Sequence, residues 1–224
     1  MLAGGCSCLA GLAMPGPLSA LPAWCAACFL ALSLAYILQK PAMLMKKPDG
    51  TVSWPSYLLF WPYHLLNRGR LLLVKILGRE SAVQAVSPGL FLGRRLVSHA
   101  EAYCVLQHGL SVLDTTCEFA ELRTLRRACG YLCVPLLDHT APSRQQLQTG
   151  VDWMLEQSKR GPVFVHCAAG HGRSAAFVCA FLVKAGLAAS AGEAIVIVVA
   201  KRPGVRMSRQ QLLALDDFCS HEPA

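Results

Sequence analysis

Charge is scarce in this sequence of 224 residues: only 15% of the side chains are Asp, Glu, Lys or Arg, whereas 54% are hydrophobic. This composition excludes a disordered chain, because disordered chains are rich in charge and poor in apolar residues. The sequence has no arginine-rich tail and no basic stretch interleaved with aromatic residues, so we expect no nucleic-acid partner. It also has no internal repeat, and its length suits one domain with a further segment.

A regular cysteine framework is absent too. The 11 cysteines are odd in number and irregularly spaced, which excludes a small secreted disulfide scaffold and predicts reduced thiols inside a cell. Cys25 and Cys28 form a Cys-x-x-Cys pair, but they lie in an apolar run with no second pair and no histidine nearby. We therefore expect no metal site there.

Residues 1–39 contain no charged side chain, and 21–38 form an apolar run of 18 residues. Such a run predicts a transmembrane helix, because about 20 apolar residues cross a bilayer. Lys40, Lys46 and Lys47 follow the run, which predicts a single-pass protein whose remaining chain lies on the cytoplasmic side. A cleaved signal peptide is the alternative, but no basic region precedes the run.

Residues 40–83 are then predicted to form a juxtamembrane segment. Its His64, Arg68, Lys75 and Arg79 are spaced so that they share one face of a helix, with leucines over much of the rest. The pattern fits a basic amphipathic helix in the plane of a membrane. A helix packed on the following domain fits it equally. The net charge of +8, of which +5 lies in residues 1–80, favours a membrane partner.

From residue 84 the pattern changes to short strands alternating with helices. Apolar runs predict strands at 90–93, 111–114, 131–135 and 163–166. A Ser or Thr followed three residues later by Glu or Gln predicts a helix start at five places: Ser98/Glu101, Thr115/Glu118, Ser143/Gln146, Ser190/Glu193 and Ser208/Gln211. Residues 84–222 are therefore predicted to form an α/β domain with a central sheet flanked by helices.

The residues that carry chemistry lie where a buried strand meets a loop with two glycines, Gly170 and Gly172, and a helix begins at Arg173. Backbone N–H groups in such a loop form a nest for an anion, which the helix dipole reinforces. The same field stabilises a thiolate at Cys167, and the planar guanidinium of Arg173 can hold two phosphate oxygens at once.

The spacing Cys-x5-Arg alone predicts little, because about 0.7 matches are expected by chance in this chain. Cys117 and Arg123 indeed share that spacing. No glycine lies between them, however, and they fall at the start of a helix predicted over 118–129. We interpret that pair as structural.

The motif His166-Cys167-x-x-Gly170-x-x-Arg173-Ser174 resembles the reactive loop of the cysteine-dependent phosphatases, in particular the dual-specificity branch of the protein tyrosine phosphatase superfamily. The similarity extends to 88–93, 109–114 and 202–205 and to the helix that begins near Ser208, and so covers roughly 84–222. It implies a hydrolase that works through a phosphocysteine intermediate and needs no metal or other cofactor.

The resemblance also implies roles for single residues. Cys167 is the nucleophile, and the phosphate is bound by Arg173 and by the loop residues Ala168, Ala169, Gly170, His171 and Gly172. Asp138 stands where the family has its general acid, which protonates the leaving group. Ser174 eases departure of the thiolate, and His166 supports the loop from below.

The substrate is a phosphoprotein or a phospholipid. Ala168 and His171 occupy positions where lipid-directed relatives carry Lys or Arg. We therefore expect a membrane-anchored phosphatase acting on protein phosphotyrosine, phosphoserine and phosphothreonine. The alternatives are a phospholipid phosphatase of the phosphatidylglycerophosphate or phosphoinositide type, an inactive phosphate-binding module, and a rhodanese-like sulfur transferase or arsenate reductase.

Overall fold

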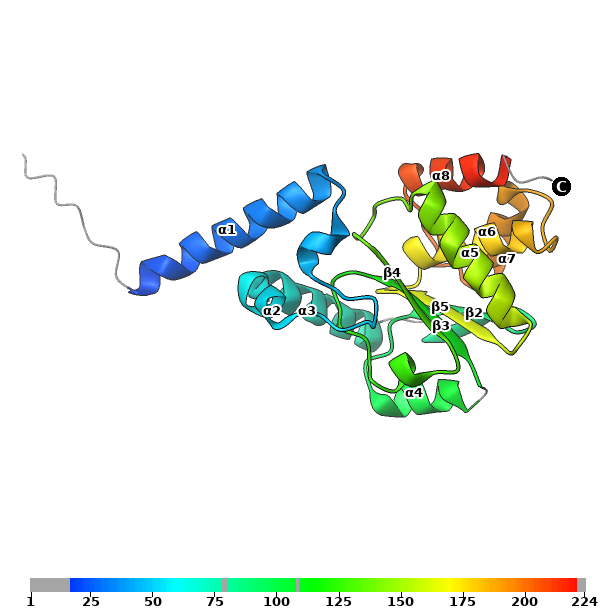
Figure 1. Ribbon diagram of the computed structural model, residues 1–224, viewed down its shortest axis with the longest axis horizontal. Coiled ribbons are helices and arrows are strands. Elements are labelled where there is room, and N and C mark those ends of the chain that lie inside the picture. The colour runs from blue at the N-terminus through cyan, green and yellow to red at the C-terminus, as the bar shows by residue number, and fades with distance from the viewer. Residues whose placement is uncertain (1–16, 78–79, 108, 221–224) are drawn as a thin grey trace, which may run out of the picture.

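The computed structural model describes residues 17–77, 80–107 and 109–220, with side chains from residue 21 (Figure 1). Its elements, in chain order, are α1 (Pro17–Ile37), η1 (Pro41–Leu44), α2 (Trp54–Leu59), α3 (Trp61–Leu77), β1 (Val83–Ser87), β2 (Leu90–Arg94), α4 (His99–Leu106), β3 (Ser111–Thr116), η2 (Leu125–Arg127), β4 (Tyr131–Leu136), α5 (Arg144–Ser158), β5 (Val163–Cys167), α6 (Arg173–Lys184), α7 (Ala191–Lys201) and α8 (Arg209–Ser220).

The five strands form one sheet in the order β1-β2-β5-β3-β4. β1 is antiparallel to β2, and the other neighbours are parallel. Each strand expected from an apolar run is present, while the edge strand β1 was not expected. β5 lies at the centre and every one of its residues is buried, which explains why its sequence is apolar without alternation.

Helices cover both faces of the sheet (Figure 1). The larger core lies between the sheet and α5 to α8, and α4 packs on the opposite face. α6 is the innermost helix, because its residues from Arg173 to Leu182 are all buried. The α/β architecture with a flanked central sheet agrees with the expectation. The central strand and the innermost helix meet at the loop that carries Cys167.

The serines of four expected helix starts, Ser98, Ser143, Ser190 and Ser208, each accept a hydrogen bond from the backbone three residues on. The fifth start is wrong: Thr115 lies inside β3, and its hydroxyl donates to the carbonyl of His166. The helix expected over 118–129 is wrong as well, since only the short η2 forms there. Glu118 instead pairs with Arg173 and Glu121 with His166, and the backbone follows these contacts.

The expected membrane-spanning helix at 21–38 is also wrong. Within the described ranges, we find no helix that combines the length and the apolar character needed to cross a bilayer. Cys28 and Ala35 are moreover buried against the rest of the protein. The single-pass topology expected from this helix is therefore wrong too.

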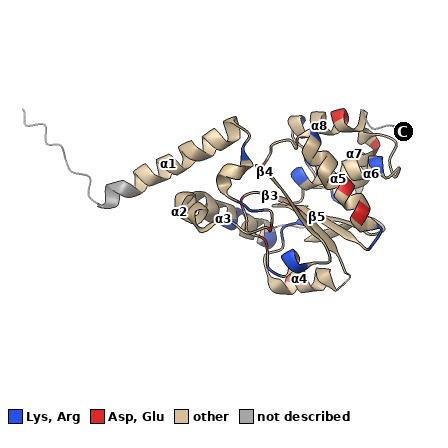
Figure 2. Ribbon diagram, viewed as in Figure 1, with Lys and Arg blue, Asp and Glu red and all other residues tan. Residues whose placement is uncertain are grey.

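The basic residues of α3 do not form one solvent-facing stripe. His64 is buried, where its ring contacts the hydroxyl of Ser56 and the carbonyl of Glu118. Lys75 pairs with Glu101 on α4, and Arg79 lies outside the described residues. Figure 2 shows that α1 and α2 carry no charged side chain and that the charges gather on the sheet domain and on α3.

Candidate active site

The reactive loop, residues 167–173, connects the central strand β5 to the innermost helix α6. Gly170 has φ of +78°, and a Cβ at this position would collide with the carbonyl of Gly93 on the neighbouring strand. Only glycine therefore allows the loop to pass this close to β2. This close approach turns the loop so that its N–H groups can converge on the thiol of Cys167.

The Cys167 thiol is 3% exposed and receives two hydrogen bonds at its sulfur. The backbone N–H of Gly170 and the hydroxyl of Ser174 both donate to Sγ over 3.2 Å. Burial on its own would raise the pKa of this thiol. The charge of Arg173 and these hydrogen bonds outweigh burial, so the pKa of Cys167 lies below its ordinary value. Such a thiol exists more readily as the nucleophilic thiolate.

Arg173 is fixed by a partner that the sequence analysis missed. Its two terminal nitrogens donate to both carboxylate oxygens of Glu118 over 2.9 and 2.7 Å, and Nη1 also donates to the carbonyl of Leu136. Both charged side chains are almost fully buried, so the fork is rigid. Nε of Arg173 is buried and finds no hydrogen-bond partner in the described part of the chain. That donor suits an oxygen of a bound phosphate.

Asp138 lies just after β4 and reaches the same arginine. Its Oδ1 is 3.0 Å from Nη2 of Arg173, and its Oδ2 accepts a hydrogen bond from Arg70 of α3 over 2.7 Å. Burial raises the pKa of this carboxyl, but Arg173 and then Arg70 lower it more, so the pKa lies below its ordinary value. A phosphate bound in the loop would compete for Arg173, and its negative charge would push the pKa of Asp138 upward again.

His166 lies beneath the loop in a buried network. Its Nδ1 is 3.3 Å from the carbonyl oxygen of Cys167, and its Nε2 is 3.2 Å from the Glu121 carboxylate. Burial lowers the pKa of His166, but Glu121 and Asp114 outweigh burial and raise it. When this ring is protonated, it places a positive charge directly below the Cys167 thiol. Glu121, like Glu118, was missed by the sequence analysis.

Asp114, Glu121 and His166 are the one trio of potential metal ligands close together in the described part of the chain. The ammonium of Lys46 already pairs with Asp114 and also donates to Thr116. The Lys46 ammonium therefore already supplies a positive charge at this site. We assign the trio to charge balance below the loop.

The outer part of the loop is held by Arg202. Its Nε donates to the carbonyl of Gly170 and its Nη2 to that of Ala169, each over 3.0 Å. His171 lies beside it, with Nε2 2.6 Å from the carboxylate of Glu80. Ala168 accepts a hydrogen bond from the backbone of Arg95 through its carbonyl. The loop carbonyls are thus tied back, which leaves the N–H groups to face an anion.

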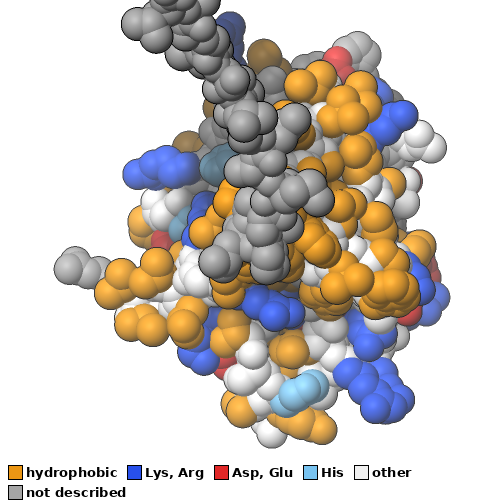
Figure 3. Space-filling model, turned by 90° about the vertical axis from the view of Figure 1, so that its left-hand side faces the viewer, with side chains coloured by type: hydrophobic (Ala, Val, Ile, Leu, Met, Phe, Trp, Pro, Cys, Tyr) orange, Lys and Arg blue, Asp and Glu red, His pale blue; other side chains and the backbone are white. Residues whose placement is uncertain are grey.

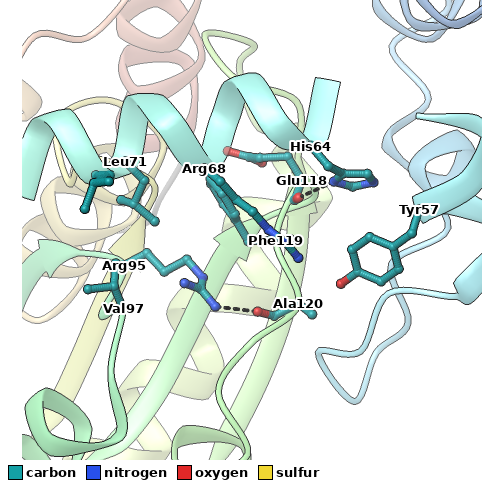
Figure 4. A pocket seen from close by; sticks show the side chains of 10 residues that line it. Tyr57, His64, Arg68, Leu71, Arg95, Val97, Glu118, Phe119 and Ala120 are labelled. Carbon is teal, nitrogen blue, oxygen red and sulfur yellow. Dashed lines mark hydrogen bonds between the residues drawn. The ribbon is translucent and has the colours of Figure 1, made fainter. Parts of the chain in front are cut away.

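Two cavities border this centre. One of about 290 Å³ lies between α3 and residues 118–120, where His64 and Arg68 face Glu118 and Phe119 (Figure 4). The other, of about 400 Å³, is lined by Leu73, Val74 and Leu77 of α3 together with Ala169 and His171 of the loop. The second cavity adjoins the reactive loop directly.

Cys117 and Arg123, which share the Cys-x5-Arg spacing, do not form a second site of this kind. Cys117 is fully buried, and burial together with the negative charge of Glu118 raises the pKa of its thiol well above the ordinary value. Arg123, in contrast, is exposed. The two cysteines therefore differ in the direction in which the protein shifts their pKa.

Replacing Ser174 should move the pKa of Cys167. Its hydroxyl stabilises the thiolate, so Ser174→Ala should raise that pKa and slow alkylation by iodoacetamide at neutral pH. The measurement is the rate of inactivation against pH, with Ser158→Ala, an exposed serine on α5, as the matched control. An unchanged profile in Ser174→Ala would show that the hydroxyl does not stabilise the thiolate.

Comparison with solved structures gives the same fold. The crystal structure of Tk-PTP in its active form superposes with a TM-score of 0.57 at 26% identity, covering 63% of this chain and 98% of that chain. PTPMT1 in complex with PI(5)P gives 0.56 at 23%, covering 62% and 96%. The human tyrosine phosphatase-like serine/threonine/tyrosine-interacting protein gives 0.55 at 20%, covering 62% and 95%. The likenesses below 25% identity show the fold alone.

Among curated proteins nothing matches the chain. The family model of the dual specificity phosphatase catalytic domain, however, matches residues 105–219, just over half of the chain. This match includes the reactive loop and Asp138, and it confirms the resemblance found in the sequence. The chain belongs to the dual specificity phosphatase family.

Proposed function

We propose that the protein hydrolyses phosphomonoesters with Cys167 as nucleophile. The observation that carries this proposal is the buried sulfur at the focus of the Gly170 N–H and the Ser174 hydroxyl, beside the rigid guanidinium of Arg173. Such a centre attracts a phosphate and holds the attacking atom next to it.

The reaction proceeds in two steps. In the first, Sγ of Cys167 attacks phosphorus and the bond to the ester oxygen breaks, while Asp138 gives its proton to the departing oxygen. In the second, a water attacks the phosphocysteine, Asp138 takes a proton from this water, and inorganic phosphate leaves. Ser174 donates to the sulfur as it departs, and Arg173 holds the phosphoryl oxygens throughout.

Phosphoproteins are the first candidate substrates. Within the loop, an anion would meet the unpartnered Nε of Arg173 and the backbone amides, because His171 is paired with Glu80 and position 168 is alanine. A single phosphate on a protein side chain needs no further cation. The preference for phosphoproteins expected from the sequence therefore stands as part of this proposal.

A phospholipid is the second candidate, and the cavity beside the loop favours it. Leu73, Val74 and Leu77 give this cavity an apolar wall next to Ala169 and His171. The glycerol and first acyl carbons of a lipid monoester would find an apolar surface there. The likeness to PTPMT1, crystallised in complex with PI(5)P, does not support this alternative, because at 23% identity it shows the fold alone.

One comparison separates the two candidates. The full chain is assayed for phosphate release from a phosphotyrosine peptide, a phosphothreonine peptide and short-chain phosphatidylglycerophosphate. We expect the highest kcat/KM on a peptide. A preference of tenfold or more for the lipid, about 1.4 kcal/mol of transition-state discrimination, would reverse the order of the candidates. Phosphate release from none of them would contradict the proposed reaction.

A further inference from the structure

The outer side of α3 is apolar although it faces solvent. Six of its residues are between 55 and 73% exposed: Leu65, Leu66, Leu72, Leu73, Ile76 and Leu77. The side that packs on the domain instead holds Tyr63, His64 and Leu71. A helix on the surface of a globular domain normally turns its apolar stripe inward, so this orientation is the reverse of the usual one.

The apolar surface continues onto α2. Trp54, Leu58, Leu59 and Trp61 are exposed there, and Trp54 is 72% exposed. We call these four residues and the six of α3 the α2–α3 apolar face. Figure 3 views the molecule from the side on which α1, α2 and α3 lie in Figure 1, and hydrophobic side chains cover much of the visible surface, with Lys and Arg side chains beside and between them. Tryptophans at the edge of such a surface suit the boundary between lipid and water.

The charges along this face have one sign. Residues 54–77 contain no Asp or Glu, whereas Arg68, Arg70 and Lys75 are all exposed, although Arg70 also pairs with Asp138 and Lys75 with Glu101 outside this segment. Arg68 and Lys75 are seven residues apart and so lie along one border of the apolar stripe, and Arg70 lies on the other border. Long basic side chains can extend from such borders to anionic headgroups while the stripe enters the apolar layer.

These features select one kind of partner, an apolar layer beneath an anionic surface. A second copy of this chain fits less well, because a two-fold contact would press the same cation-bordered face against itself. We propose that the α2–α3 apolar face docks on the surface of an anionic phospholipid bilayer, with α3 lying in the plane of that surface and no part of it crossing the membrane.

Docking in this orientation would place the reactive loop at the level of the headgroups. Arg70, on one border of the face, already contacts Asp138, and Leu73 and Leu77 line the cavity beside Ala169 and His171. The surface and the active site therefore share α3. Docking on the bilayer does not depend on which substrate the enzyme hydrolyses, because the active site would reach both a phosphoprotein at the membrane and a phospholipid from this position.

The test is cosedimentation of the full chain with vesicles of phosphatidylcholine alone or of phosphatidylcholine mixed with phosphatidylglycerol. We expect binding to the mixed vesicles that weakens as salt is added, because salt screens the cations. The triple variant Leu65→Gln/Leu66→Gln/Ile76→Gln should bind about tenfold or more weakly, since it removes apolar area from the face. Leu187→Gln/Val196→Gln/Leu213→Gln, with equally exposed residues elsewhere, should bind as the native chain does.

A second measurement needs no destabilising variant. Lipids brominated on their acyl chains should quench the fluorescence of the native chain, and Trp54→Phe should lose a large part of that quenching. The proposal would be overturned if the Leu65→Gln/Leu66→Gln/Ile76→Gln variant bound the vesicles as tightly as the native chain, or if the brominated lipids did not quench the native fluorescence. It would also be overturned if light scattering showed that the native chain is a dimer and that this variant is a monomer. No substrate is present in these measurements, so phosphate release from a soluble phosphate ester tests the proposed reaction separately.

Discussion

Cys167→Ser should abolish phosphate release, with a loss of at least about 10⁴ in kcat, and still bind inorganic phosphate. A serine hydroxyl stays protonated at neutral pH, so it lacks the charge that makes the thiolate a nucleophile. The groups that hold the anion remain, because Gly170 and Arg173 are unchanged and Arg173 keeps its fork on Glu118. Turnover of a soluble phosphate ester measures the first effect, and titration calorimetry with phosphate measures the second.

Cys117→Ser is the matched control. Cys117 has the same spacing to an arginine and is equally buried, but the protein raises the pKa of its thiol. The variant should keep near-native turnover, since a buried neutral thiol takes no part in the reaction. Equal losses in both variants would mean that the chemistry does not depend on Cys167 alone, and the assignment of the nucleophile would fail.

Local patterns in the sequence predicted the parts of the site that are themselves local. A buried strand, two glycines and an apolar helix stand together along the chain, and they form β5, the reactive loop and α6 in that order. The helix starts at Ser98, Ser143, Ser190 and Ser208 depend on contacts three residues away, so they too could be predicted. The family match then confirmed what the loop resembled.

The missed residues hold the site through long-range contacts. Glu118 lies 55 residues before the arginine that it fixes, and Glu121 pairs with a histidine that is far from it in sequence. Their spacing resembled a helix start, because Thr115 and Glu118 match the capping pattern. Two buried ion pairs outweigh that local preference, and the segment remains irregular. No periodic pattern along the chain could indicate such partners.

The apolar N-terminal segments show a different limit. The sequence predicted an apolar helix over 21–38 and a helix carrying His64, Arg68 and Lys75 within 40–83, and α1 and α3 form there. It could not predict which side of each helix faces the protein. α1 buries Cys28 and Ala35 against the fold, whereas α3 buries a histidine and exposes every described leucine except Leu71. The orientation depends on which neighbours offer partners, such as the Glu118 carbonyl that meets His64.

Asp138→Asn should lower kcat by roughly 10²–10⁴ for esters whose alcohol is a poor leaving group. An amide cannot give a proton to the departing oxygen, so the oxygen must leave as an alkoxide or phenoxide. For an ester with a very acidic alcohol the departing anion is stable without a proton, and the same variant should lose much less. The measurement is kcat on a series of aryl phosphates of graded leaving-group pKa, with Asp152→Asn, an exposed aspartate on α5, as the control.

The pH dependence of the activity tests the role of Asp138 as the acid in a second, independent way. Asp138 must hold its proton to act as the acid, so native activity on poor leaving groups should fall as pH rises through the pKa of this carboxyl in the complex. Arg173 and Arg70 lower that pKa in the free protein, and the bound phosphate opposes them, so the fall should lie at higher pH with substrate bound. Asp138→Asn should remove this fall, because no proton remains to be lost. Equal losses on all leaving groups, with the fall still present, would show that Asp138 only positions Arg173 and that another group is the acid.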